Sequence, residues 1–254
     1  MDLLVWLALG VAVVAFLYSA VGHAGASGYI AVMSLLGLAP AEIRMAALVL
    51  NILVASIATV QFALAGHFSW RLFWPFALLA VPLAFVGGVA PLPDAALKVL
   101  LGVVLLWSAG QLLLRPPADA DVVRAPRTGA LAAGGGIGLL AGLTGTGGGI
   151  FLTPLVLFLR WAPAKTAAAV SAPFILLNSI AGLGGTLAAG GTVPAFVGVP
   201  LAAALVGGLA GSWLGARRIA PAGIKRLLAV VLAIAGTKLL LTCWGEGARA
   251  IRRG

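Results

Sequence analysis

Two glycine-rich stretches carry the residues of this sequence that could do chemistry. The first, "GHAGASG" at residues 22–28, contains His23 and Ser27. The second, "GLTGTGGG" at residues 142–149, has glycine at five of its eight positions. Glycine inside a helix costs about 1 kcal/mol relative to alanine, so each stretch predicts a helix break. Glycine also lets a ligand approach the backbone closely, which makes each break a candidate binding site.

The chain around these stretches is typical of a membrane protein. It has 254 residues, of which 62% are hydrophobic and 9% are charged, whereas a soluble domain carries about 25% charged residues. Its mean hydropathy is +1.16. Apolar runs of about 20 residues, the length that spans a bilayer, recur and do not alternate with polar residues, which disfavours a β-barrel. We expect an all-α, multi-pass protein of the cell inner (cytoplasmic) membrane, with its first apolar run retained.

The charge pattern and the single cysteine exclude several other classes. The net charge of +10 comes from short Lys and Arg clusters at helix ends, where cytoplasmic loops collect them. This distribution argues against nucleic acid as a partner. Cys243 alone allows neither an intramolecular disulfide nor a Cys-rich metal site. The sequence therefore predicts no metal, no cofactor and no catalytic residue.

The order of segments repeats along the chain. A run, a glycine break, a short run and three long runs occupy residues 1–114 and again residues 128–244. "LVLNILVAS" at 48–56 resembles "FILLNSIAG" at 174–182, which brings Asn51, the fourth residue of its stretch, and Asn178, the fifth of its own, to similar places in the two halves. Five runs is an odd number, so the second half should enter the membrane from the opposite side. This is an inverted repeat, a plan that recurs in secondary transporters.

Basic residues predict the orientation. Ten of them fall on one side of the predicted membrane and five, including Arg44, on the other. The side with ten is expected to be cytoplasmic. The polar segment 115–127 is then a cytoplasmic linker, and the basic tail 245–254 and the N-terminus face outward.

The short runs at 29–39 and 150–160 predict half-helices. Eleven residues of helix measure about 16 Å, roughly half of the hydrocarbon core. The first N–H groups of such a helix lack helical partners and carry the positive end of its dipole. Together these groups form an anion site. The competing interpretation is that the glycines allow close helix packing.

Polar residues near the breaks complete the predicted site. His23 could donate to an anion or carry a proton, and Asn51 and Asn178 could offer amide donors or tie helices together. The hydroxyls of Ser27, Thr144 and Thr146 are weaker candidates. The predicted substrate-binding residues are His23, Gly25, Ala26, Ser27, Gly28, Tyr29 and Asn51 in the first half, and Thr144, Thr146, Gly147, Gly148, Gly149, Ile150, Asn178 and Ser179 in the second.

These residues resemble a known family. "GLLAGLTGTGGGIFLTPLVLFL", with its G-x-G-G-G-x-x-x-x-P pattern from Gly145 to Pro154, and "SAVGHAGASGYIAVMSLLGLAP" in the first half are similar to the sulfite exporter TauE/SafE family. The resemblance covers essentially the whole chain. It implies a permease for sulfur-containing anions such as sulfite or organosulfonates, with the two glycine stretches flanking the path. The first stretch departs from the pattern because it lacks three consecutive glycines, which puts a symmetric site in doubt.

Two other functions compete with a permease. An anion channel could use the same half-helices to line a pore. Residues 25–28 also match the G-x-S-G motif of rhomboid proteases, but such an enzyme needs a histidine base near Ser27 on another helix, and the second break has neither serine nor histidine. The sequence thus favours a permease over an enzyme. Its expected partners are a small anion and the lipid bilayer, with protons or the membrane potential for coupling and the oligomeric state left open.

Overall fold

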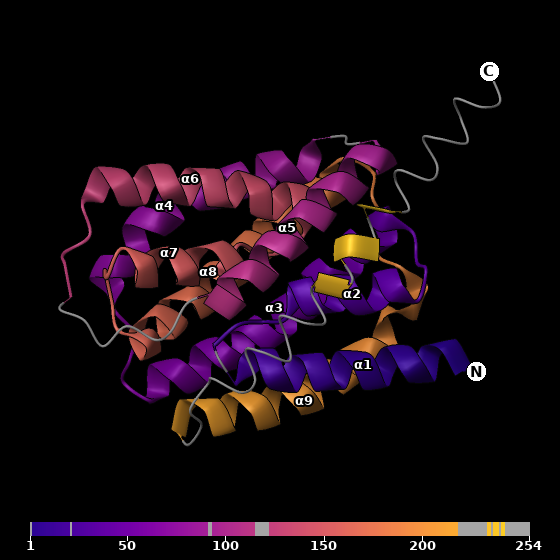
Figure 1. The fold of residues 1–254 in the computed structure, drawn as a ribbon, viewed down its shortest axis with the longest axis horizontal. Coiled ribbons are helices and arrows are strands. Elements are labelled where there is room, and N and C mark those ends of the chain that lie inside the picture. Colours follow the sequence, from indigo (N-terminus) through magenta and orange to yellow (C-terminus); the bar gives the residue numbers. More distant parts are fainter. Residues whose placement is uncertain are drawn as a thin grey trace.

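The described part of the protein is built from helices. The computed structural model describes residues 2–20, 22–90, 93–114, 122–217, 233–234, 236–238 and 240–241. The predicted last run, 222–244, falls largely outside these residues, and the tail 245–254 does so entirely. The helices (Figure 1) are α1 Asp2–Ser19, α2 Ala26–Leu35, α3 Pro40–Leu64, α4 Trp70–Val89, α5 Asp94–Leu114, α6 Arg127–Thr144, α7 Gly149–Phe158, α8 Ala164–Ala188, the 3-10 turn η1 Ala195–Val197 and α9 Gly198–Arg217.

Helix lengths repeat in the same order in the two halves. Helices α1 to α4 have 18, 10, 25 and 20 residues. Helices α6 to α9 also have 18, 10, 25 and 20 residues. Helix ends carry an uncertainty of one or two residues, so the match in length between four successive pairs supports the predicted duplication.

Four helices are long and apolar enough to cross a membrane: Pro40–Leu64, Trp70–Val89, Lys165–Ala188 and Ala195–Arg217. The two short helices, α2 and α7, have 10 residues each, about 15 Å. Helix α2 begins at Ala26, three residues before the predicted start at 29, because Gly25 is the residue that leaves helical geometry. The protein is therefore an all-α, multi-pass membrane protein.

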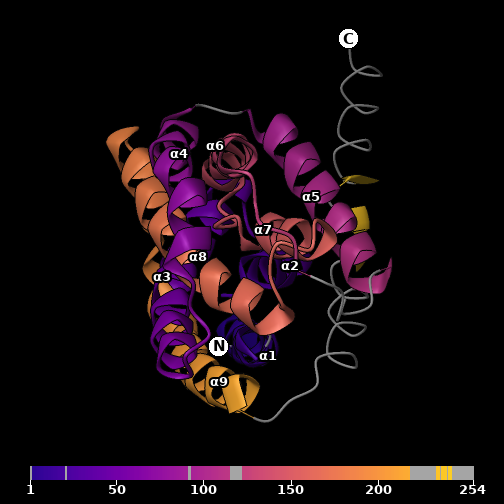
Figure 2. The ribbon, with the colours of Figure 1, turned by 90° about the vertical axis from the view of Figure 1, so that its left-hand side faces the viewer.

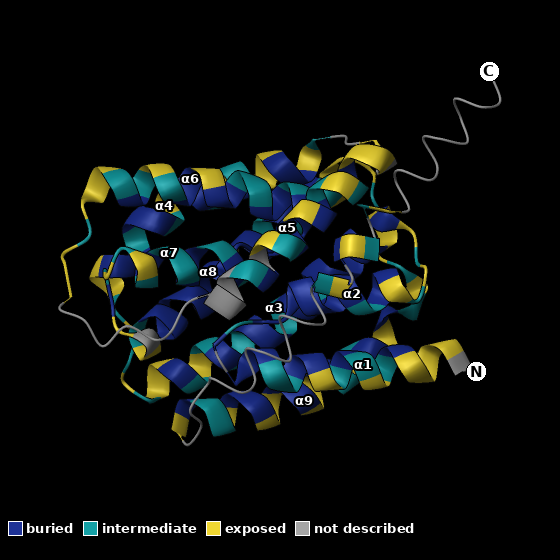
Figure 3. Ribbon diagram, viewed as in Figure 1, coloured by how far each residue is buried: buried dark blue, intermediate teal, exposed yellow. Residues whose placement is uncertain are grey.

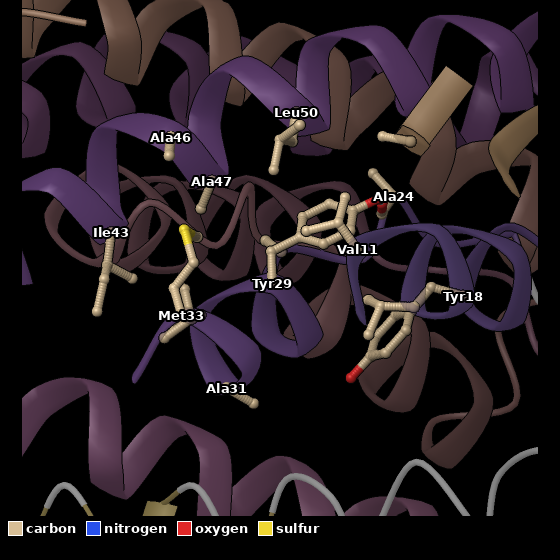
Figure 4. Close-up of a cluster of buried hydrophobic side chains, with 14 of the residues drawn as sticks. Val11, Tyr18, Ala24, Tyr29, Ala31, Met33, Ile43, Ala46, Ala47 and Leu50 are labelled. Carbon is tan, nitrogen blue, oxygen red and sulfur yellow. The ribbon is translucent and has the colours of Figure 1, made fainter. Parts of the chain in front are cut away.

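The half-helices lie in the interior of the bundle. Figure 2 shows α2 and α7 between α5 on one side and α3 and α8 on the other. Buried residues line the inward faces, and exposed residues lie along the periphery (Figure 3). The exposed residues include large apolar ones such as Trp6, 63% exposed, and Val206, 69% exposed, as expected for surfaces that face lipid. Tyr29 and Met33 of α2 pack against Ala46, Ala47 and Leu50 of α3 (Figure 4).

Glycines spaced four residues apart allow two pairs of helices to pack closely. A Cβ at each of these glycines would collide with a backbone carbonyl oxygen of the partner helix. The packing interpretation is thus correct for these glycines, as in other small-xxx-small contacts. On α6 they are Gly134, Gly138 and Gly142, which face Phe76, Ala80 and Ala84 of α4. On α9 they are Gly207, Gly211 and Gly215, which face Ala12 and Phe16 of α1 and Ala20, the residue after its end.

Replacement of Gly138 by alanine is expected to destabilise the protein by about 1–3 kcal/mol, the usual cost of overpacking. A Cβ there would meet the carbonyl of Ala80, which belongs to helix backbone and cannot move aside. Gly136 on the same helix has nothing within 4 Å of its Cβ position, so Gly136→Ala is the matched control. Thermal unfolding in detergent should show a lower midpoint for Gly138→Ala alone, and equal midpoints would contradict this packing.

The contacts also fix helix directions. Partner numbers rise together between α4 and α6, and between α1 and α9, so each of these pairs is parallel. Between α3 and α8 they run in opposite order. Leu48 contacts Gly182, whereas Asn51 bonds to Ser179. Helices α3 and α8 hold the same place in the two halves and are antiparallel, which supports the predicted inversion.

Candidate functional site at the two helix breaks

The first break ends at Gly25, which caps α2 with a φ of 101°. This is the left-handed region that favours glycine. The Tyr29 side chain folds back over the break, and its hydroxyl donates to the carbonyl of Ala24 at 2.7 Å. The Tyr29 amide donates to the Gly25 carbonyl at 2.9 Å, so it belongs to the helix ladder. The amides without helical partners at this end are therefore those of residues 26–28.

The second break uses three glycines in left-handed geometry. Gly145, Gly147 and Gly148 have φ values of 74°, 70° and 83°. The segment lies along one face of α3, because a Cβ at Gly145 would meet the backbone of Arg44, and a Cβ at Gly147 would meet the Asn51 amide nitrogen at 2.7 Å. Other residues would be strained at these angles. This explains why the sequence concentrates glycine there.

The two breaks meet inside the bundle. The Cβ position of Gly149, the first residue of α7, lies 3.6 Å from the Cδ2 atom of His23. Gly147, two residues earlier, lies against Asn51 and against Ser179, whose Oγ would be 2.8 Å from its Cβ. Asn51 is near the middle of α3, the helix Pro40–Leu64. Two segments more than 100 residues apart in the sequence thus come together at mid-helix depth. We call the group His23, Asn51, Gly147, Gly149 and Ser179, together with Asn178, which precedes Ser179 on α8, the junction.

The junction holds polar atoms without partners. Asn51 and Asn178 are both 0% exposed. The Asn51 amide nitrogen donates to Ser179 Oγ at 3.3 Å. Among the described residues, the Asn51 carbonyl oxygen and both amide atoms of Asn178 have no hydrogen-bond partner. Such groups are rare in native structures, and each costs about 1–3 kcal/mol. These buried amide atoms are therefore candidate contacts for a polar ligand.

The hydroxyl groups that were predicted to bind the substrate make hydrogen bonds to nearby protein groups. Ser27 shares a hydrogen bond of 2.8 Å with the Tyr18 hydroxyl. Thr144 donates to the Leu140 carbonyl at 2.6 Å and pairs with Thr146 at 2.8 Å. These bonds hold the breaks in shape.

Several other predicted site residues face apolar neighbours. Gly28 packs against Val14 and Tyr18 of α1, and Gly148 packs against Ile137 and Phe174. Ala26 and Ile150 are buried, at 4% and 8% exposure. These residues shape the half-helix starts, and their side chains offer no polar group to a ligand.

Replacement of Ser27 by alanine is expected to leave transport within about threefold of wild type. It should cost about 1 kcal/mol of stability, because the Tyr18 hydroxyl loses its partner. The partner of Ser27 is this tyrosine, and a nucleophilic serine would need a base in that place. Substrate flux and thermal unfolding measure the two effects. Complete loss of activity in a folded Ser27→Ala protein would restore the protease interpretation.

Arg44 is an interior residue that the sequence analysis counted among the basic residues on the outer side of the membrane. It is 7% exposed and lies in the second turn of α3. Its Nη2 atom donates to the carbonyls of Gly87, Gly88 and Gly142 at 2.8, 2.9 and 2.8 Å, and its Nε atom donates to Gly142 at 3.1 Å. Its seven-residue spacing from Asn51 puts both on one face of α3, and that spacing was the signal available in the sequence.

Lys238 is a second cation that binds carbonyls at a helix end, and it is partly buried. Its Nζ atom donates to the carbonyls of Ser34 and Leu35 at 2.7 and 2.8 Å. These carbonyls end α2, so the ammonium lies at the negative end of that helix dipole. The half-helix is therefore held at its far end by the last apolar run.

The fold and the junction define a multi-pass membrane protein with two interrupted helices that meet inside the bundle. The family model described as sulfite exporter TauE/SafE matches residues 7–239, and the chain belongs to this family. It is 41% identical over 241 residues to the "Probable membrane transporter protein y4hK" of Sinorhizobium fredii, covering 92% of this chain and 97% of that protein. No solved structure matches the chain significantly. The protein is thus a membrane transporter and not an enzyme.

Proposed function

We propose that the protein is a secondary transporter for sulfur-containing anions, such as sulfite or organosulfonates, and that the anion binds at the junction. The observation that carries this proposal is the meeting of the two breaks beside Asn51 and Asn178, which have three unpartnered amide atoms. Helix N-termini favour negative charge. The description of the matching family names sulfite as an exported substrate.

In this mechanism the anion replaces the missing hydrogen-bond partners. The Asn178 and Asn51 amides and the first N–H groups of α7 donate to its oxygens, and His23 donates from the first break. The unpartnered carbonyl oxygens of the two asparagines suit a ligand that also carries a hydroxyl or a bound water. Movement of the helices around this fixed site gives alternating access.

Orientation and coupling complete the proposal. Arg44 lies inside the bundle and no longer counts toward the outer side. That side then has four basic residues against ten on the cytoplasmic side, which strengthens the predicted orientation. The linker 115–127 is then cytoplasmic. His23 is a titratable side chain close to Gly149, and in this proposal it carries a coupled proton. The alternative is movement driven by the membrane potential alone.

The test is uptake by liposomes that contain the purified protein. Sulfite, sulfate, thiosulfate, sulfoacetate and taurine are offered in turn at constant pH. Saturable uptake of at least one of them, with acceleration by the same anion trapped inside, supports a carrier. Flux that does not saturate and shows no such counterflow indicates a channel. Failure to bind or move any of them would refute the proposed substrate class.

A further inference from the structure

Arg44 carries a positive charge that no side chain neutralises in the part of the chain that the structure describes. It is the one charged residue among the buried polar side chains of the described segments. Its hydrogen bonds all go to backbone carbonyls, those of Gly87, Gly88 and Gly142. Carbonyls stabilise a guanidinium but leave its net charge in place. Unpaired cations inside a membrane protein are costly and mark substrate or ion pathways.

The carbonyls that hold Arg44 belong to helix ends. Gly87 and Gly88 lie in the last turn of α4, which ends at Val89, and Gly142 lies in the last turn of α6, which ends at Thr144. The negative ends of two helix dipoles therefore converge on the guanidinium. This explains how the cation is tolerated when no ligand is bound. It also fixes the side chain in place, so its charge acts from a defined position.

That position is next to the junction. Gly145 packs against Arg44 and Gly147 packs against Asn51, so the second break follows α3 from the one residue to the other. Seven residues of helix place Arg44 about 10 Å from Asn51 along the axis. In the first break, Gly22 packs against Ala168 of α8. The second break thus lies against a cation, Arg44, whereas the first break lies against the methyl group of Ala168.

We propose that Arg44 determines charge selectivity: it attracts anions to the junction and favours dianions over monoanions. This inference rests on the proposed function. Charges about 10 Å apart, at the effective dielectric constant of about 20 that suits proteins, interact strongly enough to change affinity about tenfold for each unit of ligand charge. Arg44 acts at a distance through its field, and the asparagine amides and helix N–H groups make the contacts.

The experiment compares ligands that share a shape and differ in charge. Sulfate and methanesulfonate are tetrahedral sulfur oxyanions with two charges and one, and sulfoacetate and isethionate form a second such pair. Affinities are measured by calorimetry on the purified protein for wild type, Arg44→Gln and Arg44→Lys. Arg44→Gln is expected to weaken monoanion binding about tenfold and dianion binding about 100-fold. Arg44→Lys keeps the charge and should retain the preference for dianions.

Lys238→Gln is the matched control. Lys238 also donates to carbonyls at a helix end, but it lies at the C-terminal end of α2, about 14 Å from the residue that begins this helix. Its charge acts less strongly at that greater distance, so Lys238→Gln should shift the preference for dianions by less than Arg44→Gln does. Elution as a single species in size-exclusion chromatography checks that each variant folds.

The outcomes separate this inference from the proposed function. If wild type binds neither these four anions nor sulfite, the proposed function fails. If wild type binds them and Arg44→Gln weakens both members of each pair equally, Arg44 has a structural role and the inference is wrong. Should Arg44→Gln not fold, Arg44→Lys decides, because loss of the dianion preference in that folded, charged variant would also overturn the inference.

Discussion

Replacement of Asn178 by leucine is expected to weaken anion binding and transport about 10- to 100-fold, while the protein becomes as stable as wild type or more stable. Both amide atoms of Asn178 are buried without a partner among the described residues. Each unsatisfied group costs about 1–3 kcal/mol, and an apolar side chain of similar shape removes that cost. A hydrogen bond to a charged ligand is worth about 1.5–3 kcal/mol, which is the source of the lost affinity.

The control for Asn178 is on the same helix. Ser171 of α8 shares a buried hydrogen bond of 2.6 Å with Thr153. Ser171→Ala should lower stability by about 1–3 kcal/mol, because it leaves the Thr153 hydroxyl unsatisfied, and should leave anion affinity unchanged. Asn178→Leu should therefore lower the uptake rate without lowering the thermal midpoint. Ser171→Ala should lower the thermal midpoint without lowering the uptake rate. A stability loss in Asn178→Leu with unchanged transport would show that this amide serves packing.

Replacement of Gly147 by alanine is expected to reduce transport at least about 100-fold. The added Cβ would lie 2.7 Å from the Asn51 amide nitrogen and 2.8 Å from the Ser179 hydroxyl, so it would enter the junction. The residue also has a φ of 70°, where alanine costs about 1–2 kcal/mol. Initial uptake rates at saturating substrate measure the loss.

Substitution of Gly66 distinguishes backbone strain from the collision at the junction as the cause of the loss. Its φ of 75° is close to that of Gly147, but nothing lies within 4 Å of its Cβ position. Gly66→Ala therefore carries the same backbone strain without the collision, and it should keep uptake within about twofold of wild type. Equal losses in both variants would mean that backbone strain, and not occupation of the junction, explains the effect of Gly147→Ala.

Much of the fold follows from composition and periodic breaks. Apolar runs of spanning length predict the long helices, and a glycine cluster before a short run predicts each half-helix. The residue at which each short helix begins does not follow from the hydropathy pattern. Helix α2 begins at Ala26 because Gly25 takes left-handed geometry, whereas the hydropathy pattern placed the start at residue 29. Glycine is common in close helix contacts as well as in breaks, so hydropathy alone does not tell whether Gly28 lies inside a helix.

The candidate site was predictable only in part, because residue type does not reveal the partner of a side chain. Asn51 and Asn178 could be singled out by their equivalent places in the two halves. The pairing of Ser27 with Tyr18 depends on how α1 packs against α2. Arg44 was counted with the basic residues of the outer side because Lys and Arg usually gather at the ends of membrane helices. Its burial depends on carbonyls of α4 and α6 that lie about 40 and 100 residues away in the sequence.

The central claim is that one anion binds where the two breaks meet, and the position of a bound anion tests it most directly. Selenate or selenite can replace sulfate or sulfite in crystals of the protein, and anomalous scattering from selenium locates the bound ion. We expect one peak within about 4 Å of the Asn178 amide, the range of a hydrogen-bonded oxyanion, and within reach of the start of α7. A peak elsewhere in the bundle, with none beside Asn178 for an ion that the protein transports, would contradict the account.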